Sequence, residues 1–313
     1  WLVLSSGGAA RAFGAGVLNG WSARGDRPRF DLVTGVSAGA LIAPFAFVGP
    51  ETDAALARVF TAASTDRLNR ARSLSAGLFG QGAIPARPLR ALIDSHLTEG
   101  FTARIAARHR AGARLLIVTT NLDAQRNVIW NLGAIAASDR PGKLRLIGDL
   151  LQASASIPAI FPPVRIAVEG NGRHFDELHA DGGVMRQIYL VPEALWIDPA
   201  PARLCPRISA IVNAEIAPSF ALVPQQSIRV AERALASLEK LNLTLGVGDI
   251  ADFARRIGAE FRLASIDRAI PAQPHLPFDP VFMEAAFALG HDKGLSGRWE
   301  HGPPVGTVLL DGQ

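Results

Sequence analysis

Cysteine is nearly absent from this sequence, since Cys205 is the only one among 313 residues. A single cysteine cannot pair within the chain, which excludes a disulfide-stabilised scaffold, and we interpret Cys205 as a small buried or loop residue. Long apolar runs are also missing. The longest, residues 40–48, is shorter than the roughly 20 residues of a membrane-spanning helix and contains Pro44. With 49% hydrophobic and 19% charged residues, the composition is that of an ordinary folded protein.

Lysine is scarce as well, and the positive charge is not clustered. Only Lys143, Lys240 and Lys293 occur, so most of the 32 basic residues are arginines spread along the chain. A nucleic-acid-binding face needs a basic stripe or a recognisable motif. We therefore expect no nucleic-acid partner, and we note that a net charge of +4 favours contact with anionic lipid.

Strand-like and helix-like segments alternate along the chain, which predicts an α/β fold with a mostly parallel central sheet flanked by helices. We expect strands at residues 1–4, 30–34, 114–120 and 208–212, and helices at 13–21 and from Ala40. Residues 1–313 are expected to form a single domain, with its motifs in 1–190 and a helical C-terminal part at 220–300.

Three series of apolar residues recur at helical spacing, and we predict that each faces the core. The series are Leu89, Leu92, Ile93 and Leu97; Ile228, Ala231, Leu235, Leu238 and Leu241; and Ile250, Phe253, Ile257 and Phe261. Residues 75–88, 157–163 and 271–280 are rich in glycine and proline and are predicted to be surface loops. In the first of these loops, Leu78 and Phe79 either pack inward or contact lipid.

The sequence Gly35-Val36-Ser37-Ala38-Gly39 is a G-x-S-x-G motif between a predicted strand and a predicted helix. A serine in such a sharp turn needs neighbours without Cβ atoms two positions away on both sides. The turn would present the Ser37 hydroxyl near a helix N-terminus, which favours developing negative charge. We therefore predict that Ser37 is a nucleophile.

The turn of small residues at 5–9 directly follows the first predicted strand. Several backbone N–H groups there can point into one concavity and stabilise an oxyanion. A phosphate-binding loop is the competing interpretation, but the chain has no G-x-x-x-x-G-K-[ST], and its glycine spacing does not fit G-x-G-x-x-G well.

Asp181 is the candidate general base, because none of the seven histidines lies in a setting that marks it as a partner of Ser37. A carboxylate followed by Gly182 and Gly183 can lie where the backbone turns tightly and another segment approaches. Partial burial would raise its pKa toward neutrality and let it accept the serine proton. Asp-Gly is also a common hairpin turn, so the spacing alone leaves both interpretations open.

Taken together and in order, these motifs resemble those of the patatin-like phospholipases. The resemblance covers residues 1 to about 190 and also includes residues 12–18 and the sequence ASASIPAIFPP at 153–163, while residues 278–299 are similar to the family's closing helix. It implies a three-layer patatin-like fold and a serine hydrolase of the phospholipase A or lysophospholipase type. It further implies a Ser37–Asp181 dyad without histidine and an oxyanion hole in the first glycine turn, which we assign to Gly7, Gly8 and Ala38. The substrate would be a phospholipid or another fatty-acyl ester, with no metal or organic cofactor.

The chain departs from the family pattern G-G-G-x-[RK]-G. Ser6 replaces the first glycine, Ala10 replaces the basic residue, and Arg11 replaces the last glycine, so that the arginine is displaced by one position. After Asp-Gly-Gly the chain reads Val-Met-Arg-Gln at 184–187, without the asparagine and proline often found there. Ser6 keeps a backbone N–H, so the oxyanion hole can survive, but the role of Arg11 and the shape of the pocket are open.

Two other functions stay open at this point: a carboxylesterase with a Ser-His-Asp triad, using His179 or His291, and a non-catalytic lipid-binding protein on the same fold. We expect a bacterial protein that is soluble or peripherally bound to a membrane. Its compartment is not predicted, and the cell envelope remains open, because any targeting segment or lipid anchor would precede Trp1.

Overall fold

The structure is a computed structural model that describes residues 1–61, 84–170, 172–190, 207–272 and 278–302. Leu78, Phe79, Cys205 and His275 lie outside these described residues. The strands are β1 (Leu2–Leu4), β2 (Leu32–Val36), β3 (Arg114–Asn121), β4 (Arg126–Asn131), β5 (Val164–Gly170), β6 (Arg173–Asp181), β7 (Arg207–Ile211) and β8 (Glu260–Ala264). The α-helices are α1 (Phe13–Arg24), α2 (Ala38–Val48), α3 (Asp53–Phe60), α6 (Ala86–His96), α7 (Glu99–Arg110), α8 (Leu132–Ala137), α9 (Lys143–Ser154), α11 (Ser227–Ile257) and α12 (Pro280–Ser296). Short 3₁₀ turns follow β1 (Gly8–Ala10), α2 (Pro50–Thr52) and β6 (Gly182–Val184).

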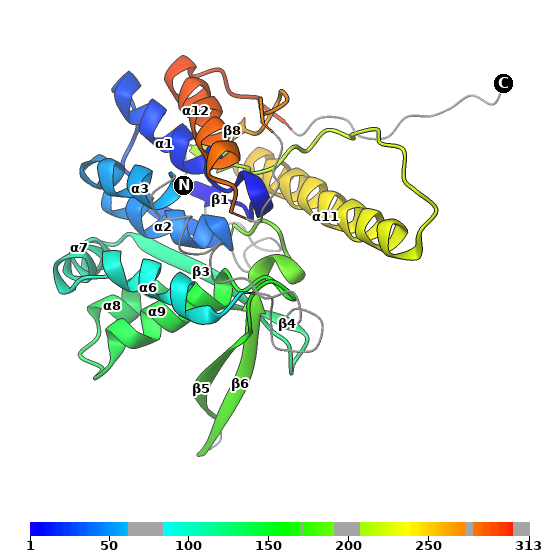
Figure 1. The fold of residues 1–313 in the computed structure, drawn as a ribbon. Helices are drawn as coiled ribbons and strands as arrows, with labels where there is room; N and C mark the ends of the chain where they lie inside the picture. The colour runs from blue at the N-terminus through cyan, green and yellow to red at the C-terminus, as the bar shows by residue number, and fades with distance from the viewer. Residues whose placement is uncertain (62–83, 171, 191–206, 273–277, 303–313) are drawn as a thin grey trace.

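A single sheet forms the centre of the molecule, with the order β5-β6-β3-β2-β1-β7-β8 and with β4 paired to β3 (Figure 1). Strands β3, β2, β1, β7 and β8 run parallel to one another, whereas β4 and β6 are antiparallel to β3, and β5 is antiparallel to β6. This arrangement confirms the predicted α/β class with a mostly parallel sheet.

Helices cover both faces of the sheet and give the fold its three layers. Side chains alternate along a strand, so Leu2 and Leu4 point to one face and Val3 to the other. The first face packs against α1, α2, α3, α6, α7, α8, α9 and α12, and the second against the C-terminal half of α11. None of the described helices is both long and apolar enough to cross a membrane.

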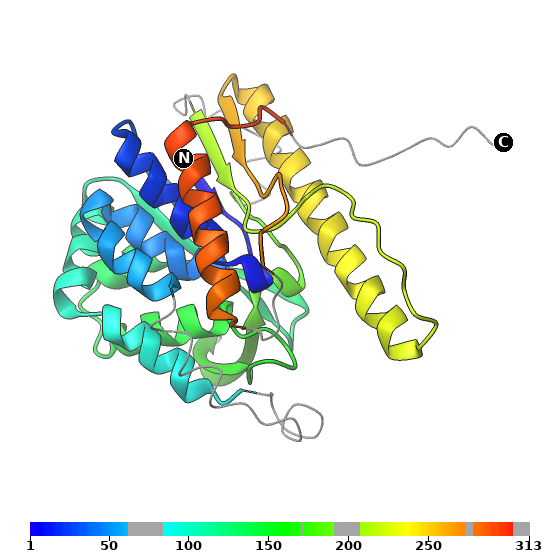
Figure 2. The same cartoon turned by 45° about the horizontal axis from the view of Figure 1, so that its top comes forward.

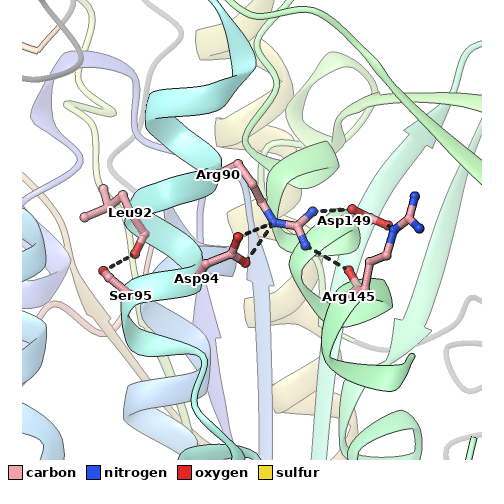
Figure 3. Close-up of polar contacts among 6 residues, drawn as sticks. All are labelled: Arg90, Leu92, Asp94, Ser95, Arg145 and Asp149. Atoms are coloured by element: carbon pink, nitrogen blue, oxygen red, sulfur yellow. Dashed lines mark hydrogen bonds and ion pairs between the residues drawn. The ribbon is translucent and has the colours of Figure 1, made fainter. Parts of the chain in front are cut away.

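An ion-pair network joins α6 to α9 (Figure 3). Arg90 of α6 donates from Nε to Asp94 at 2.8 Å and from Nη1 to Asp149 of α9, which also lies 3.8 Å from Arg145. The network holds the apolar side of α6 against the body. Leu89 and Ile93 are buried there, as their spacing predicts.

The prediction that the series beginning at Ile228 faces the core is wrong. Residues 227–257 form one continuous helix, and its N-terminal half extends beyond the sheet (Figures 1 and 2), where no described element covers these side chains. Only the second half packs on the sheet. In the third predicted series, Ile250 and Phe253 are buried in this half, but Phe261 belongs to β8, because the helix ends at Gly258 in the left-handed conformation.

The segment 157–163 is not simply a surface loop. Phe161 is fully buried in the core, and the Ile84 N–H donates to the carbonyl of Ile160 at 2.8 Å. Sequence composition placed this segment outside because it contains three prolines, but its aromatic side chain packs edge-to-face on Phe278. This contact ties the segment to the start of α12.

Helices α1 and α12 pack through glycines so closely that their backbones touch. A Cβ atom added at Gly16 would lie 2.0 Å from the carbonyl oxygen of Phe287, and one at Gly290 would lie 2.0 Å from that of Phe13. Gly20 and Gly294 make equivalent contacts one turn further along. Since these contacts involve backbone atoms, no side chain can move aside to make room.

We predict that Gly290→Ala lowers the free energy of unfolding by about 1–3 kcal/mol, because the new methyl group forces the two helices apart. The matched control is Gly248→Ala in α11, where an added Cβ would meet no atom within 4 Å. That change should leave stability unaltered or raise it by up to about 1 kcal/mol through helix propensity. Urea unfolding of both variants measures the difference, and equal stability of the two would refute the close packing.

Candidate active site

The register of the sheet brings two distant residues to one point on β3. Strand β2 runs parallel to β3 and ends at Val36, which is paired with Val118. Strand β6 runs antiparallel to β3 and ends at Asp181, which is paired with Thr119. Because β4 occupies the other edge of β3 at this level, β6 must lie on the edge where β2 stops. Ser37, the residue after β2, is therefore level with Asp181.

Ser37 lies in a strained turn between β2 and α2. Its φ of 56° and ψ of −118° are in a region that side-chain-bearing residues rarely adopt. A Cβ at Gly35 would lie 2.4 Å from the Gly39 carbonyl oxygen, and a Cβ at Gly39 would lie 2.4 Å from that of Leu4. The glycines on both sides are thus required by close backbone contacts, as the sequence predicts for this motif.

Ser37 and Asp181 are joined by a hydrogen bond. The Ser37 hydroxyl donates to Asp181 Oδ2 at 2.5 Å, and both side chains are buried. The other carboxylate oxygen, Oδ1, accepts from the Gly183 N–H at 2.7 Å, which fixes the carboxylate plane. Asp181 therefore presents one oxygen to the serine and has the other occupied.

Burial raises the pKa of Asp181 to about 7. The hydrogen bonds from Ser37 and Gly183 and the positive charge of Arg11 oppose this rise, whereas the negative charge of Glu239 adds to it. A carboxyl group with a pKa near neutrality is suited to accept a proton from a hydroxyl group and to return it.

Three residues to which the sequence analysis gave no role hold the site in place. Ser154 Oγ accepts from the Ser37 N–H at 3.1 Å and donates to the Val118 carbonyl at 2.7 Å. Asn213 and Gln187 hold the glycine turn: Asn213 Nδ2 donates to the Ser5 carbonyl at 3.0 Å, and the Gln187 carbonyl accepts from the Ser6 N–H at 2.8 Å. Asn213 directly follows the predicted strand at 208–212. A polar residue at the carboxyl end of a parallel strand is often part of a binding site, and this position could have identified Asn213 from the sequence.

Two backbone N–H groups that have no acceptor among the described residues line the pocket that contains Ser37. In the first turn of α2, the N–H groups of Gly39 and Ala40 donate to the carbonyls of Ser5 and Ser37. The Ala38 N–H, like that of Gly8, makes no hydrogen bond to any described residue, and both residues line the same pocket as Ser37. Gly7 lies behind them and lines a neighbouring pocket with Gly8.

Two pockets meet at Ser37. The apolar pocket has about 520 Å³ of empty space and is lined mainly by aliphatic and aromatic side chains, among them Leu41, Leu89, Leu92, Phe161 and Met283. The second pocket, called the polar pocket here, has about 670 Å³ of space, part of it open to solvent, and combines the polar side chains Ser6, Asp181, Gln187 and Glu239 with apolar ones such as Ile157 and Ile160. Ser37 thus lies between a largely apolar pocket and one that also offers polar side chains, an arrangement that fits a substrate with one apolar and one polar end.

The displaced Arg11 still reaches the site. Its guanidinium lines the apolar pocket with Ser37, and its Cζ atom lies 4.0 Å from the centroid of the Phe278 ring. Burial lowers the pKa of Arg11 to about 10, while the charge of Asp181 acts in the opposite direction. The shift by one position therefore leaves a cation next to Ser37 and Asp181.

The histidines do not complete a triad in the part of the chain that the structure describes. None of the six described histidines hydrogen-bonds to Ser37 or Asp181. His179 is buried on β6, where Nδ1 lies 2.9 Å from Thr119 Oγ1 and Nε2 lies 3.3 Å from Glu177, and burial lowers its pKa. Among the described residues, no group of three His, Cys, Asp or Glu side chains is arranged to hold a metal ion.

Residues 2–191 match the protein family described as Patatin-like phospholipase. No curated protein matches the chain. Among solved structures, the chain is similar to VipD from Legionella pneumophila, with a TM-score of 0.42 and 13% sequence identity over 94% of this chain and 66% of that one. The chain thus spans just under two thirds of the VipD chain. Because the family match extends over more than half of the sequence, this chain belongs to the patatin-like phospholipase family.

Proposed function

We propose that this protein hydrolyses fatty-acyl esters of phospholipids or lysophospholipids through a Ser37–Asp181 dyad. Membership of the family supports the hydrolysis of lipid esters in general. The observation that carries the finer proposal is the 2.5 Å hydrogen bond from the Ser37 hydroxyl to a buried carboxylate at the junction of an apolar and a polar pocket.

In the first half-reaction, Asp181 accepts the Ser37 proton while Oγ attacks the ester carbonyl carbon. The carbonyl oxygen becomes an oxyanion, which the N–H groups of Gly8 and Ala38, with Gly7 behind them, are positioned to stabilise. The intermediate collapses, the alcohol leaves with the proton from Asp181, and the acyl group stays on Ser37. Water then attacks the acyl-enzyme while Asp181 accepts a proton from it, and the fatty acid leaves as Asp181 returns that proton to Ser37 Oγ.

The two pockets suggest how the substrate lies. The apolar pocket matches an acyl chain, which loses contact with water when it binds there. The polar pocket, with Ser6, Gln187 and Glu239, suits the glycerol and headgroup side of the leaving alcohol. Arg11 lies close enough to Asp181 to limit the rise of its pKa, so the carboxylate form remains available near neutral pH.

The central prediction concerns the catalytic pair. Ser37→Ala should reduce fatty-acid release to background, and Asp181→Asn should reduce it by about 10²–10⁴-fold, because an amide cannot accept the proton. Asp176→Asn, on the exposed part of the same strand, is the matched control and should keep full activity. A panel of phospholipid, lysophospholipid and neutral lipid measures all three. Release that persists in Ser37→Ala would refute the dyad.

A second prediction concerns pH. Asp181 must be ionised to act as base, so kcat/KM for a soluble short-chain ester should rise with pH and level off above an apparent pKa of about 7. Since the charge of Glu239 raises the pKa of Asp181, Glu239→Gln should move this inflection to lower pH.

The control for this pH measurement is Glu232→Gln on the same helix. Glu232 pairs with Arg229 at 2.9 Å and does not line the polar pocket, so its variant should keep the inflection of the parent protein. An inflection near the ordinary carboxyl value of about 4 in the parent would contradict the assignment of Asp181 as base.

A further inference from the structure

The two halves of α11 have opposite surroundings. In the C-terminal half, Leu243, Val247, Ile250 and Phe253 are buried against the sheet. In the N-terminal half, which projects from the body (Figure 2), the large apolar side chains are exposed. The outer leucine face consists of Ile228, Leu235, Leu238 and Leu241 in this half and Leu245 just past the middle of the helix, with exposed fractions of 65%, 62%, 62%, 54% and 59%.

The outer leucine face follows one side of the helix, interrupted near its C-terminal end by Asn242, which donates to the carbonyl of Met185 at 2.7 Å. At 3.6 residues per turn its five members fall within roughly 140° of the helix circumference. The opposite side of this half carries Arg233 and Lys240, which donate to the carbonyls of Ser219 at 2.5 Å and Ala217 at 2.6 Å. The preceding segment is thus held on the polar side, and the described part of the chain leaves the apolar side to solvent.

The polar side of the same half of the helix borders the site. Ala236, Lys240 and Leu243 line the pocket that reaches Gly7 and Gly8. Glu239 also lines the polar pocket with Ser37 and Asp181. A surface that contacts the outer leucine face therefore lies one helix diameter away from the pockets beside Ser37.

The depth of an interfacial helix matches this geometry. A helix is about 10 Å across, and an amphipathic helix at a membrane buries its apolar side by roughly 5–10 Å. If α11 lies on a lipid surface by its outer leucine face, the pockets on its inner side open at the level of the lipid headgroups. The ester bonds of the proposed substrate lie at that level.

Charge indicates which lipid. Residues 217–228 contain no charged side chain, while the following turns carry Arg229, Arg233 and Lys240 against Glu232 and Glu239. Only Arg229 pairs with a carboxylate among the described residues, and this half of the helix has three basic and two acidic side chains, a small excess of positive charge.

We propose that the outer leucine face of α11 docks this protein on a lipid surface that carries anionic headgroups. The proposal rests on the proposed function, because a lipid ester hydrolase must reach substrate held in such a surface. Apolar contact supplies the attachment, and Arg233 and Lys240 favour anionic over neutral lipid.

The test is the binding of the full chain to vesicles of phosphatidylcholine with and without phosphatidylglycerol. Every protein carries Ser37→Ala, so that binding is read without hydrolysis. Leu235→Gln with Leu238→Gln should weaken binding to the mixed vesicles by about tenfold or more, because two apolar side chains no longer leave water. Binding of the parent should be tighter on the mixed vesicles than on phosphatidylcholine alone, and salt should weaken it.

The matched control removes two apolar side chains of similar exposure on other elements, Phe175→Gln on β6 and Leu295→Gln on α12, which are 49% and 46% exposed. It should bind as the parent does. Equal binding by the α11 variant and the parent, or an equal loss in the control, overturns the proposal. So does a parent that forms dimers, loses them in the α11 variant and binds neither vesicle.

Activity separates this proposal from the proposed function. With Ser37 restored, the α11 variant should lose activity on vesicle substrate and keep its rate on a soluble short-chain ester. If the parent binds vesicles as described but hydrolyses no lipid ester, the proposed function fails and the docking result stands. If it hydrolyses lipid but the α11 variant binds and acts like the parent, docking through α11 fails alone.

Discussion

The site depends on the way that two strands share one edge of β3. Strand β2 pairs with residues 114–118 of β3 and ends at Val36. Strand β6 runs in the opposite direction, pairs with residues 119–121 of β3 and ends at Asp181. Parallel and antiparallel pairing on the same edge is what places two strand ends, 144 residues apart in sequence, within hydrogen-bonding distance. The strained turn at Ser37, the glycine loop at 5–10 and the helix dipole of α2 all act on the point that this register defines.

Burial of the Asp181 carboxylate suits it to proton transfer but makes its ionised form costly. Removing the Asp181 carboxylate from water disfavours its charged form and raises its pKa to about 7, which suits proton transfer near neutral pH. The same burial makes the ionised state costly. The hydrogen bonds from Ser37 and Gly183 and the nearby charge of Arg11 offset part of this cost. Arg11, although displaced in sequence, therefore supports the carboxylate from the side of the apolar pocket.

Local sequence predicted much of the fold and the role of Ser37, whereas Asp181 was assigned as its partner on the family resemblance. Gly35 and Gly39 predicted the turn at Ser37 because backbone contacts there exclude a Cβ, and the apolar runs predicted the parallel strands. Contacts between distant segments were not predictable. Ser154, Gln187 and Asn213 reach the site only through tertiary packing. The leucines of α11 have a helical period whether a neighbour covers them or not, so periodicity could not reveal that residues 228–241 extend past the sheet.

The rate at which a fluorophosphonate labels Ser37, followed by intact mass spectrometry, tests the central claim most directly, because it reports the reactivity of the hydroxyl without a lipid surface. The account predicts one adduct in the parent protein, none in Ser37→Ala, and labelling slowed by about 100-fold or more in Asp181→Asn. Labelling at an unchanged rate in Asp181→Asn would contradict it, since the hydrogen-bonded carboxylate would then have no part in activating the serine.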